Sequence, residues 1–138
     1  MEKLLQNMTW EEAKDTIKGT KMAIIPTGST EQHGPHLPLG TDLLIADYFA
    51  KKVAEKIDVL VTPVVPVGFA HYHTSFEGTL SVNPEVLSSY YQGIAESNAC
   101  VYGCLGLLNN SFLGAVSTIF PKYITATLSQ ICFITLKS

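Results

Sequence analysis

An apolar run that leads directly into a loop of polar side chains is the feature that most constrains the fold of this chain. Residues 21–26 read Lys-Met-Ala-Ile-Ile-Pro and end at the turn-forming Thr27-Gly28-Ser29. A short apolar run bounded by turn residues is typical of a buried strand. From Leu43 to Ile57, apolar residues recur at helical spacing. The sequence therefore predicts a strand, a loop and a helix in succession.

The loop between this strand and helix carries side chains that suit a metal ion. Residues 31–42 read Glu-Gln-His-Gly-Pro-His-Leu-Pro-Leu-Gly-Thr-Asp. Imidazole and carboxylate groups are ligands that Zn²⁺ and Mn²⁺ take from proteins. Glu31 and His33 are two residues apart, so their side chains leave an extended backbone on the same side. Asp42 can return to them from the first turn of the helix, which we expect Thr41 to cap.

Each of these residues also has an ordinary structural interpretation. Asp42 lies where free N–H groups and the positive end of the helix dipole favour a carboxylate, which suits a metal ligand or a capping acid. His36 is as suited to a hydrogen bond as to a metal, and the spacing does not select it. The combination predicts a metal site of Glu31, His33 and Asp42, against the alternative of unrelated loop and capping residues.

Two blocks of the sequence resemble a known family. Residues 28–42 are similar to the signature of the creatininase (creatinine amidohydrolase) family of metal-dependent amidohydrolases. Residues 66–81 read Pro-Val-Gly-Phe-Ala-His-Tyr-His-Thr-Ser-Phe-Glu-Gly-Thr-Leu-Ser and resemble the family's next site loop, in which a proline usually stands at the place of Glu77. The resemblance covers roughly residues 10–97. It implies a parallel-sheet α/β/α sandwich and hydrolysis of a C–N amide bond of a small molecule through a metal-activated water.

The resemblance also implies roles for individual residues. In a dinuclear Zn²⁺ or Mn²⁺ centre, Glu31 would bind one metal, His33 would bind the other, and Asp42 would bridge them. His73 matches a histidine of the second block and is the implied catalytic residue, which could face the substrate or transfer a proton. A loop histidine held by hydrogen bonds is the alternative for His73. The expected partner is a small-molecule amide substrate.

One departure from the family bears on activity. Family members supply further metal ligands from a later block that reads roughly Asn-Gly-His followed by Glu or Asn. This chain has no histidine, aspartate or glutamate after Ser97. Two functions therefore remain open: a metal-dependent amidohydrolase, and a truncated, non-catalytic family member that binds one metal or none. Whether the chain is an enzyme is left undecided by the sequence, and we expect little turnover.

Composition divides the chain near the same place. Residues 1–97 hold all twelve acidic and seven of the nine basic residues, whereas residues 98–138 hold only Lys122 and Lys137. We expect residues 1–97 to be the N-terminal part of a creatininase-like domain and residues 98–138 to be a divergent apolar tail, arising from a frameshift or as an evolved short form. The uncharged stretch 97–121 is long enough for a membrane span, but its polar residues disfavour that interpretation.

The remaining patterns predict the secondary structure, the cellular location and the association state of the chain. We expect helices over 10–18, 42–57 and 84–96, and strands over 21–26 and 59–65. Strands that alternate with helices indicate a parallel sheet. The formal charge of −3 gives no footprint for nucleic acid. With no signal peptide at its start, the chain is expected to be cytoplasmic. A sheet with so few strands leaves an apolar edge, so we expect a homo-oligomer or an aggregation-prone chain.

Overall fold

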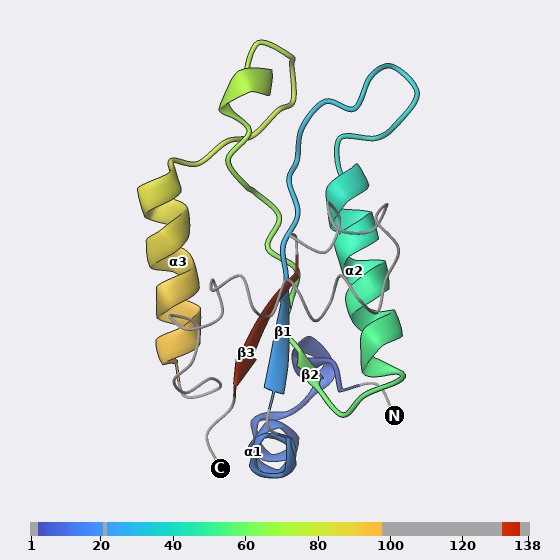
Figure 1. The fold of residues 1–138 in the computed structure, drawn as a ribbon, viewed down its shortest axis with the longest axis vertical. Helices are drawn as coiled ribbons and strands as arrows, with labels where there is room; N and C mark the ends of the chain where they lie inside the picture. The colour runs from blue at the N-terminus through green and yellow to red at the C-terminus, as the bar shows by residue number, and fades with distance from the viewer. Residues whose placement is uncertain (1–2, 21, 98–130, 136–138) are drawn as a thin grey trace, which may run out of the picture.

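A computed structural model describes residues 3–20, 22–97 and 131–135 and has an α/β fold, which confirms the predicted class. In the described residues the elements are η1 (Leu5–Asn7), α1 (Trp10–Gly19), β1 (Met22–Pro26), α2 (Thr41–Ala54), β2 (Leu60–Val61), η2 (His71–His73), α3 (Pro84–Glu96) and β3 (Ile131–Thr135). Figure 1 shows α2 and α3 on opposite sides of the small sheet, with α1 at its lower end. The sheet is therefore the middle layer of the fold.

The strand order of the sheet is β2-β1-β3. β1 pairs in parallel with β2, where Ala23 lies opposite Leu60, and antiparallel with β3, where Ile24 lies opposite Phe133. The parallel pair agrees with the predicted parallel sheet, and β3 makes the sheet mixed. β3 belongs to the tail, whose structure the sequence left open. The uncharged stretch considered above as a membrane span lies outside the described residues from residue 98 onward.

The core lies on both faces of β1. Ala23, Ile24 and Ile25 have no solvent-accessible surface. Ala23 and Ile25 pack with Leu60 and with partly buried residues of α1 and α3, whereas Ile24 packs with Val61 and residues of α2. A parallel strand that is buried on both faces requires apolar residues at successive positions, which explains the run in the sequence. Burial of each isoleucine contributes about 2 kcal/mol, so β1 is a firm base for the loop that follows it.

Two helix starts agree with the sequence patterns. At α1 the Thr9 hydroxyl accepts a hydrogen bond from the Glu12 N–H, and the Glu12 carboxylate accepts one from the Thr9 N–H. The Thr9 N–H and the Thr9 hydroxyl both donate to Glu12 Oε2, and these two hydrogen bonds lower the pKa of Glu12 because they stabilise the charged carboxylate. α3 begins at Pro84, a residue suited to a first helical position because it has no N–H to satisfy there.

Three details of the expected elements are wrong. Gly40, and not Thr41, is the N-cap of α2, because the Thr41 hydroxyl donates to the Pro38 carbonyl at 2.6 Å instead of capping the helix. α2 ends at Ala54 rather than at residue 57, since the chain tightens into a turn there. The second strand is limited to Leu60–Val61 instead of 59–65. Beyond it, the Thr62 N–H donates to the Ile24 carbonyl and the Val65 N–H to the Pro26 carbonyl, so the chain stays beside β1 without regular strand pairing. Within the described residues, no helix combines the length and the apolar character needed to cross a membrane.

Candidate metal centre

Two loops leave the sheet at the same end, above the carboxyl ends of β1 and β2 (Figure 1). We call residues 27–40 the first loop and residues 66–83 the second loop. The Leu80 N–H donates to the Thr30 carbonyl at 2.8 Å, and the Thr30 hydroxyl donates to the Pro66 carbonyl at 2.8 Å. The two loops are thus joined by hydrogen bonds. Ligands of open α/β sheets bind at this end of the strands.

A close approach at Gly28 brings the start of α2 against the first loop. A Cβ atom at Gly28 would lie only 2.8 Å from the backbone N and Cα of Leu43. Such contacts are too short for any other residue, so glycine is required here. Because Leu43 follows Asp42 directly, this contact places the backbone of Asp42 beside the first loop. A half-buried carboxylate in the first turn of a helix is also favoured by the helix dipole.

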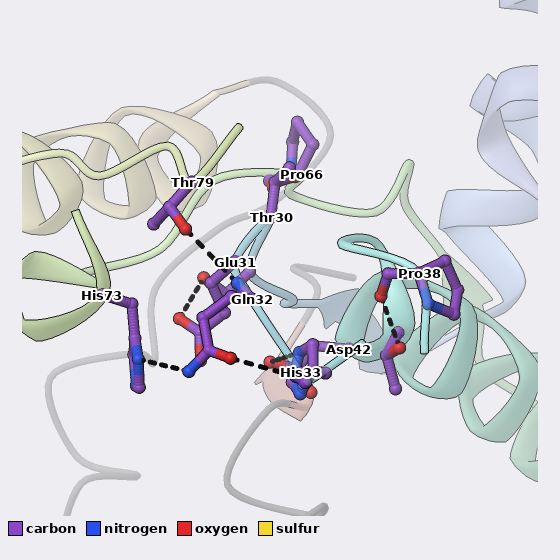
Figure 2. A network of polar contacts seen from close by, with 12 residues as sticks. Thr30, Glu31, Gln32, His33, Pro38, Asp42, Pro66, His73 and Thr79 are labelled. Carbon is purple, nitrogen blue, oxygen red and sulfur yellow. Dashed lines mark hydrogen bonds and ion pairs between the residues drawn. The ribbon is translucent and has the colours of Figure 1, made fainter. Parts of the chain in front are cut away.

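Glu31, His33 and Asp42 come together in the structure, as the spacing suggested. Each offers one ligand atom, and the three atoms lie within 4.8 Å of one another. Figure 2 shows His33 beside Asp42, with His33 Nε2 3.6 Å from Asp42 Oδ2. In the part of the chain that the structure describes, this is the one such group of three metal-binding side chains. The first loop and α2 therefore supply one imidazole and two carboxylates to a common point.

The burial of His33 Nε2 and the proximity of the two carboxylates fit a divalent cation. His33 Nε2 is buried and has no hydrogen-bond partner among the described residues. A buried polar atom without a partner costs free energy, and two carboxylates held close together repel each other. A cation between them would provide the missing partner for His33 and compensate both negative charges. Imidazole nitrogen and carboxylate oxygen are suitable donors for Zn²⁺ and Mn²⁺.

Neighbouring groups hold Glu31 in place. The Ser29 hydroxyl donates to Glu31 Oε2 at 2.8 Å, and the Glu31 N–H donates to the Leu39 carbonyl at 3.0 Å. Hydrogen bonds of this kind orient ligating carboxylates in metal sites. Sequence reasoning did not single out Ser29. Its position two residues before Glu31 was the available signal, because short side chains at that spacing can meet on one side of an extended backbone.

The other histidines of the two loops lie outside this group of three. His36 is exposed, in line with its omission from the predicted ligands. His73 lies in η2 and is partly buried, and its Nδ1 is 2.9 Å from Nε2 of Gln32. The structure thus connects His73 to the first loop through Gln32 (Figure 2). Sequence reasoning missed Gln32, because its partner is 41 positions away and no local pattern relates the two.

The fold and the carboxylate–imidazole cluster at the carboxyl ends of its parallel strands place this chain among the α/β proteins with a candidate metal site. Within that class, this chain belongs to the creatininase family, whose model, described as creatinine amidohydrolase, matches residues 6–103. The match begins before α1 and extends a few residues beyond the boundary expected at residue 97. The family resemblance seen in the two sequence blocks is therefore confirmed.

Individual relatives agree with this assignment. The chain is 38% identical over 87 residues to a mycofactocin precursor peptide peptidase of Mycobacterium tuberculosis, a match that covers 56% of this chain and 35% of the peptidase. A mutant creatininase described as Zn-Zn type matches with a TM-score of 0.63 and 29% identity, and a structure titled Creatininase Mn matches with 0.62 and 28%. Both structural matches cover 68% of this chain and 39% of the creatininase. The chain thus spans about a third of the length of the curated relatives it matches.

Proposed function

We propose that this chain acts as a metal-dependent amidohydrolase that hydrolyses a C–N amide bond. The observation that carries the proposal is the convergence of Glu31, His33 and Asp42, with a buried His33 Nε2 that has no hydrogen-bond partner among the described residues. The family description and the relatives named above support it, since they are hydrolases. They lend no support to the alternative of a non-catalytic chain.

Each residue has a distinct task in this proposal. Glu31, His33 and Asp42 would hold Zn²⁺ or Mn²⁺, which when bound supplies Lewis-acid polarisation of the amide carbonyl and activation of water. Ser29 orients the Glu31 carboxylate through its hydrogen bond. His73 remains the proposed catalytic residue, because it is joined to the loop of the metal site and can exchange a proton with a substrate.

We further propose that each chain binds one metal ion through these residues. The sequence has no histidine, aspartate or glutamate after Ser97, so the imidazole and carboxylate side-chain donors of this chain all lie in residues 1–97. The cluster would provide three protein donors, the number that catalytic zinc sites take from the protein. We retain with this proposal the division into a creatininase-like part, residues 1–97, and an apolar tail, residues 98–138.

The proposed substrate class is an amide of a small molecule or of a short peptide. Both kinds of amide are consistent with the relatives, one of which is called a peptide peptidase and others creatininase. Both contain a C–N bond next to a carbonyl group, which is the group that a cation at this site would polarise. An assay with substrates of both kinds distinguishes a small-molecule amide from a peptide amide.

The test measures hydrolysis by the full chain in the presence of Mn²⁺ or Zn²⁺. Creatinine, a small formamide and a short peptide serve as substrates, and product release is followed by chromatography. We expect Glu31→Gln and Asp42→Asn each to abolish hydrolysis, because each removes a charge that the metal requires. Glu77→Gln is the matched control, since Glu77 is an exposed acid of the second loop outside the cluster, and it should retain activity.

The double variant Glu31→Gln/Asp42→Asn reports any contaminating hydrolase in the preparation. Metal-dependent hydrolysis that is equal in this variant and in the parent chain would contradict the proposal. So would a complete absence of hydrolysis of all three substrates by a parent chain that is shown to hold metal.

A further inference from the structure

The amide of Gln32 lies between two groups whose roles can be assigned. Its Oε1 is 3.0 Å from the backbone nitrogen of Gly34, and its Nε2 is 2.9 Å from Nδ1 of His73. Figure 2 shows the Gln32 side chain directed toward His73. The Gln32 N–H in turn donates to the Thr79 hydroxyl at 3.3 Å, so the residue is held at its backbone as well as at its side chain.

Gly34 determines which way the Gln32 amide faces. A backbone N–H can only donate a hydrogen bond, so its partner must be the amide oxygen and not the NH₂ group. Gly34 reaches this position with a φ of 76°, a region that glycine adopts without strain. A Cβ atom there would also lie 3.2 Å from the His36 ring. The Gly34 N–H therefore fixes the oxygen of Gln32 toward itself and the NH₂ group toward His73.

The orientation of the amide in turn determines the hydrogen on His73. An NH₂ group can only donate, so Nδ1 of His73 must accept through its lone pair. A ring that carries hydrogen on Nδ1 has no lone pair there, and two N–H groups would face each other at 2.9 Å. In a neutral imidazole with a free Nδ1, the hydrogen is on Nε2.

We propose that Gln32 is a positioning residue that holds His73 as the neutral tautomer with its hydrogen on Nε2. His73 then offers a hydrogen-bond donor at Nε2, and not a lone pair, to any group that approaches that nitrogen. This deepens the proposed function and rests on it for one consequence: toward an amide substrate, His73 donates a hydrogen bond to an oxygen or to the leaving nitrogen. The tautomer itself does not depend on metal or on activity.

The test is the long-range ¹H–¹⁵N NMR spectrum of the histidine rings in the full ¹⁵N-labelled chain, without metal or substrate. The His73 signals are identified by their loss in His73→Phe. We expect the ¹⁵N shift of Nδ1 to be that of an unprotonated ring nitrogen and the shift of Nε2 to be that of a protonated one. A protonated Nδ1 in the parent chain would overturn the proposal, whether or not the chain hydrolyses amides.

Gln32→Glu provides a second, independent measurement. The carboxylate has nearly the shape of the amide and still accepts from Gly34, but it cannot donate to His73. The ¹⁵N shift of His73 Nδ1 should therefore move to that of a protonated ring nitrogen, because Nδ1 must now carry a hydrogen. Gln6→Glu is the control, since it makes the same change at an exposed residue of η1, and it should leave both shifts in place.

Gln32→Met covers the case in which the charge at residue 32 disturbs the loop. It keeps the length of the side chain and removes both hydrogen bonds, so the His73 shifts should move toward those of a mixture of the two tautomers. Unchanged His73 shifts in both Gln32→Glu and Gln32→Met would show that Gln32 does not set the tautomer.

Discussion

The two loops above the sheet differ in what they present to their surroundings. The first loop and the first turn of α2 direct polar groups toward one point, where the His33 and Asp42 side chains are only 21% and 18% exposed. The second loop exposes large aromatic side chains as well as a leucine; these are Phe69, Tyr72, Phe76 and Leu80, whereas the first loop exposes only the aliphatic Leu37 and Leu39 among its large apolar residues. A metal site needs donors that are already convergent before the ion arrives, because ordering them on binding would cost entropy. We infer that the first loop, with Asp42 of α2, binds the metal. The second loop supports the first loop through hydrogen bonds and exposes apolar side chains to other molecules.

Gly28→Ala should give the largest effect, because it separates the first loop from α2. The new methyl group would meet the Leu43 backbone, and overpacking of this kind costs about 1–3 kcal/mol. We expect a loss of stability in that range in urea denaturation, together with weaker metal binding as Asp42 moves away.

Gly93→Ala is the matched substitution for that experiment. Gly93 lies within α3, and among the described residues no atom beyond the adjoining helix backbone lies within 4 Å of the place that the added methyl group would take, so alanine should stabilise the helix by up to about 1 kcal/mol. Equal stability of Gly28→Ala and the parent chain would show that the close approach at α2 does not constrain the first loop.

Substitutions of two serines test whether metal affinity depends on the first loop and not on the second. Ser29→Ala removes the hydrogen bond to Glu31, and loss of such a supporting group should weaken metal binding roughly tenfold. Ser81→Ala removes the hydroxyl that accepts from the Ala70 N–H in the second loop, which should cost about 1 kcal/mol of stability and leave metal affinity unchanged. Isothermal titration and urea denaturation measure the two quantities. A larger loss of affinity in Ser81→Ala than in Ser29→Ala would reverse the assignment of the loops.

Self-association tests the exposed apolar side chains of the second loop. We expect the full chain to associate, and the double variant Tyr72→Ser/Phe76→Ser to weaken that association by about tenfold, or roughly 1.4 kcal/mol. Sedimentation velocity over a range of concentrations measures it. Trp10→Ser is the control, because Trp10 is an exposed aromatic residue of α1, away from the second loop in the fold. A parent chain that stays monomeric at all concentrations would remove this role from the second loop.

The sequence predicted the features that depend on neighbouring residues. The expected helix over 84–96 agrees with α3, and the expected strand over 21–26, predicted from an apolar run, agrees with β1. Glu31 and His33 were found because two residues in an extended loop share one side. The family resemblance supplied the roles of these residues, which spacing alone did not.

Features that depend on distant or competing contacts could not be predicted in this way. The cap of α2 was placed at Thr41, because the sequence does not show that its hydroxyl bonds to the Pro38 carbonyl. The pairing of β3 with β1 joins segments about a hundred residues apart, and an apolar run gives no partner or direction. The link between Gln32 and His73 crosses from one loop to the other, so it appears only in the folded chain.

A metal titration of two histidine variants shows whether Glu31, His33 and Asp42 form a metal site. His33 and His36 lie in the same loop, but only His33 belongs to the cluster. The full chain is first stripped of metal with a chelator and then titrated with Zn²⁺ or Mn²⁺ by calorimetry, with elemental analysis to give the number of ions. The parent chain and His36→Ala should each bind one ion with the same affinity. His33→Ala should bind at least about 100-fold more weakly, since loss of a ligand exceeds loss of a supporting group. Equal affinities for His33→Ala and His36→Ala, or no binding by the parent chain, would show that Glu31, His33 and Asp42 do not form a metal site.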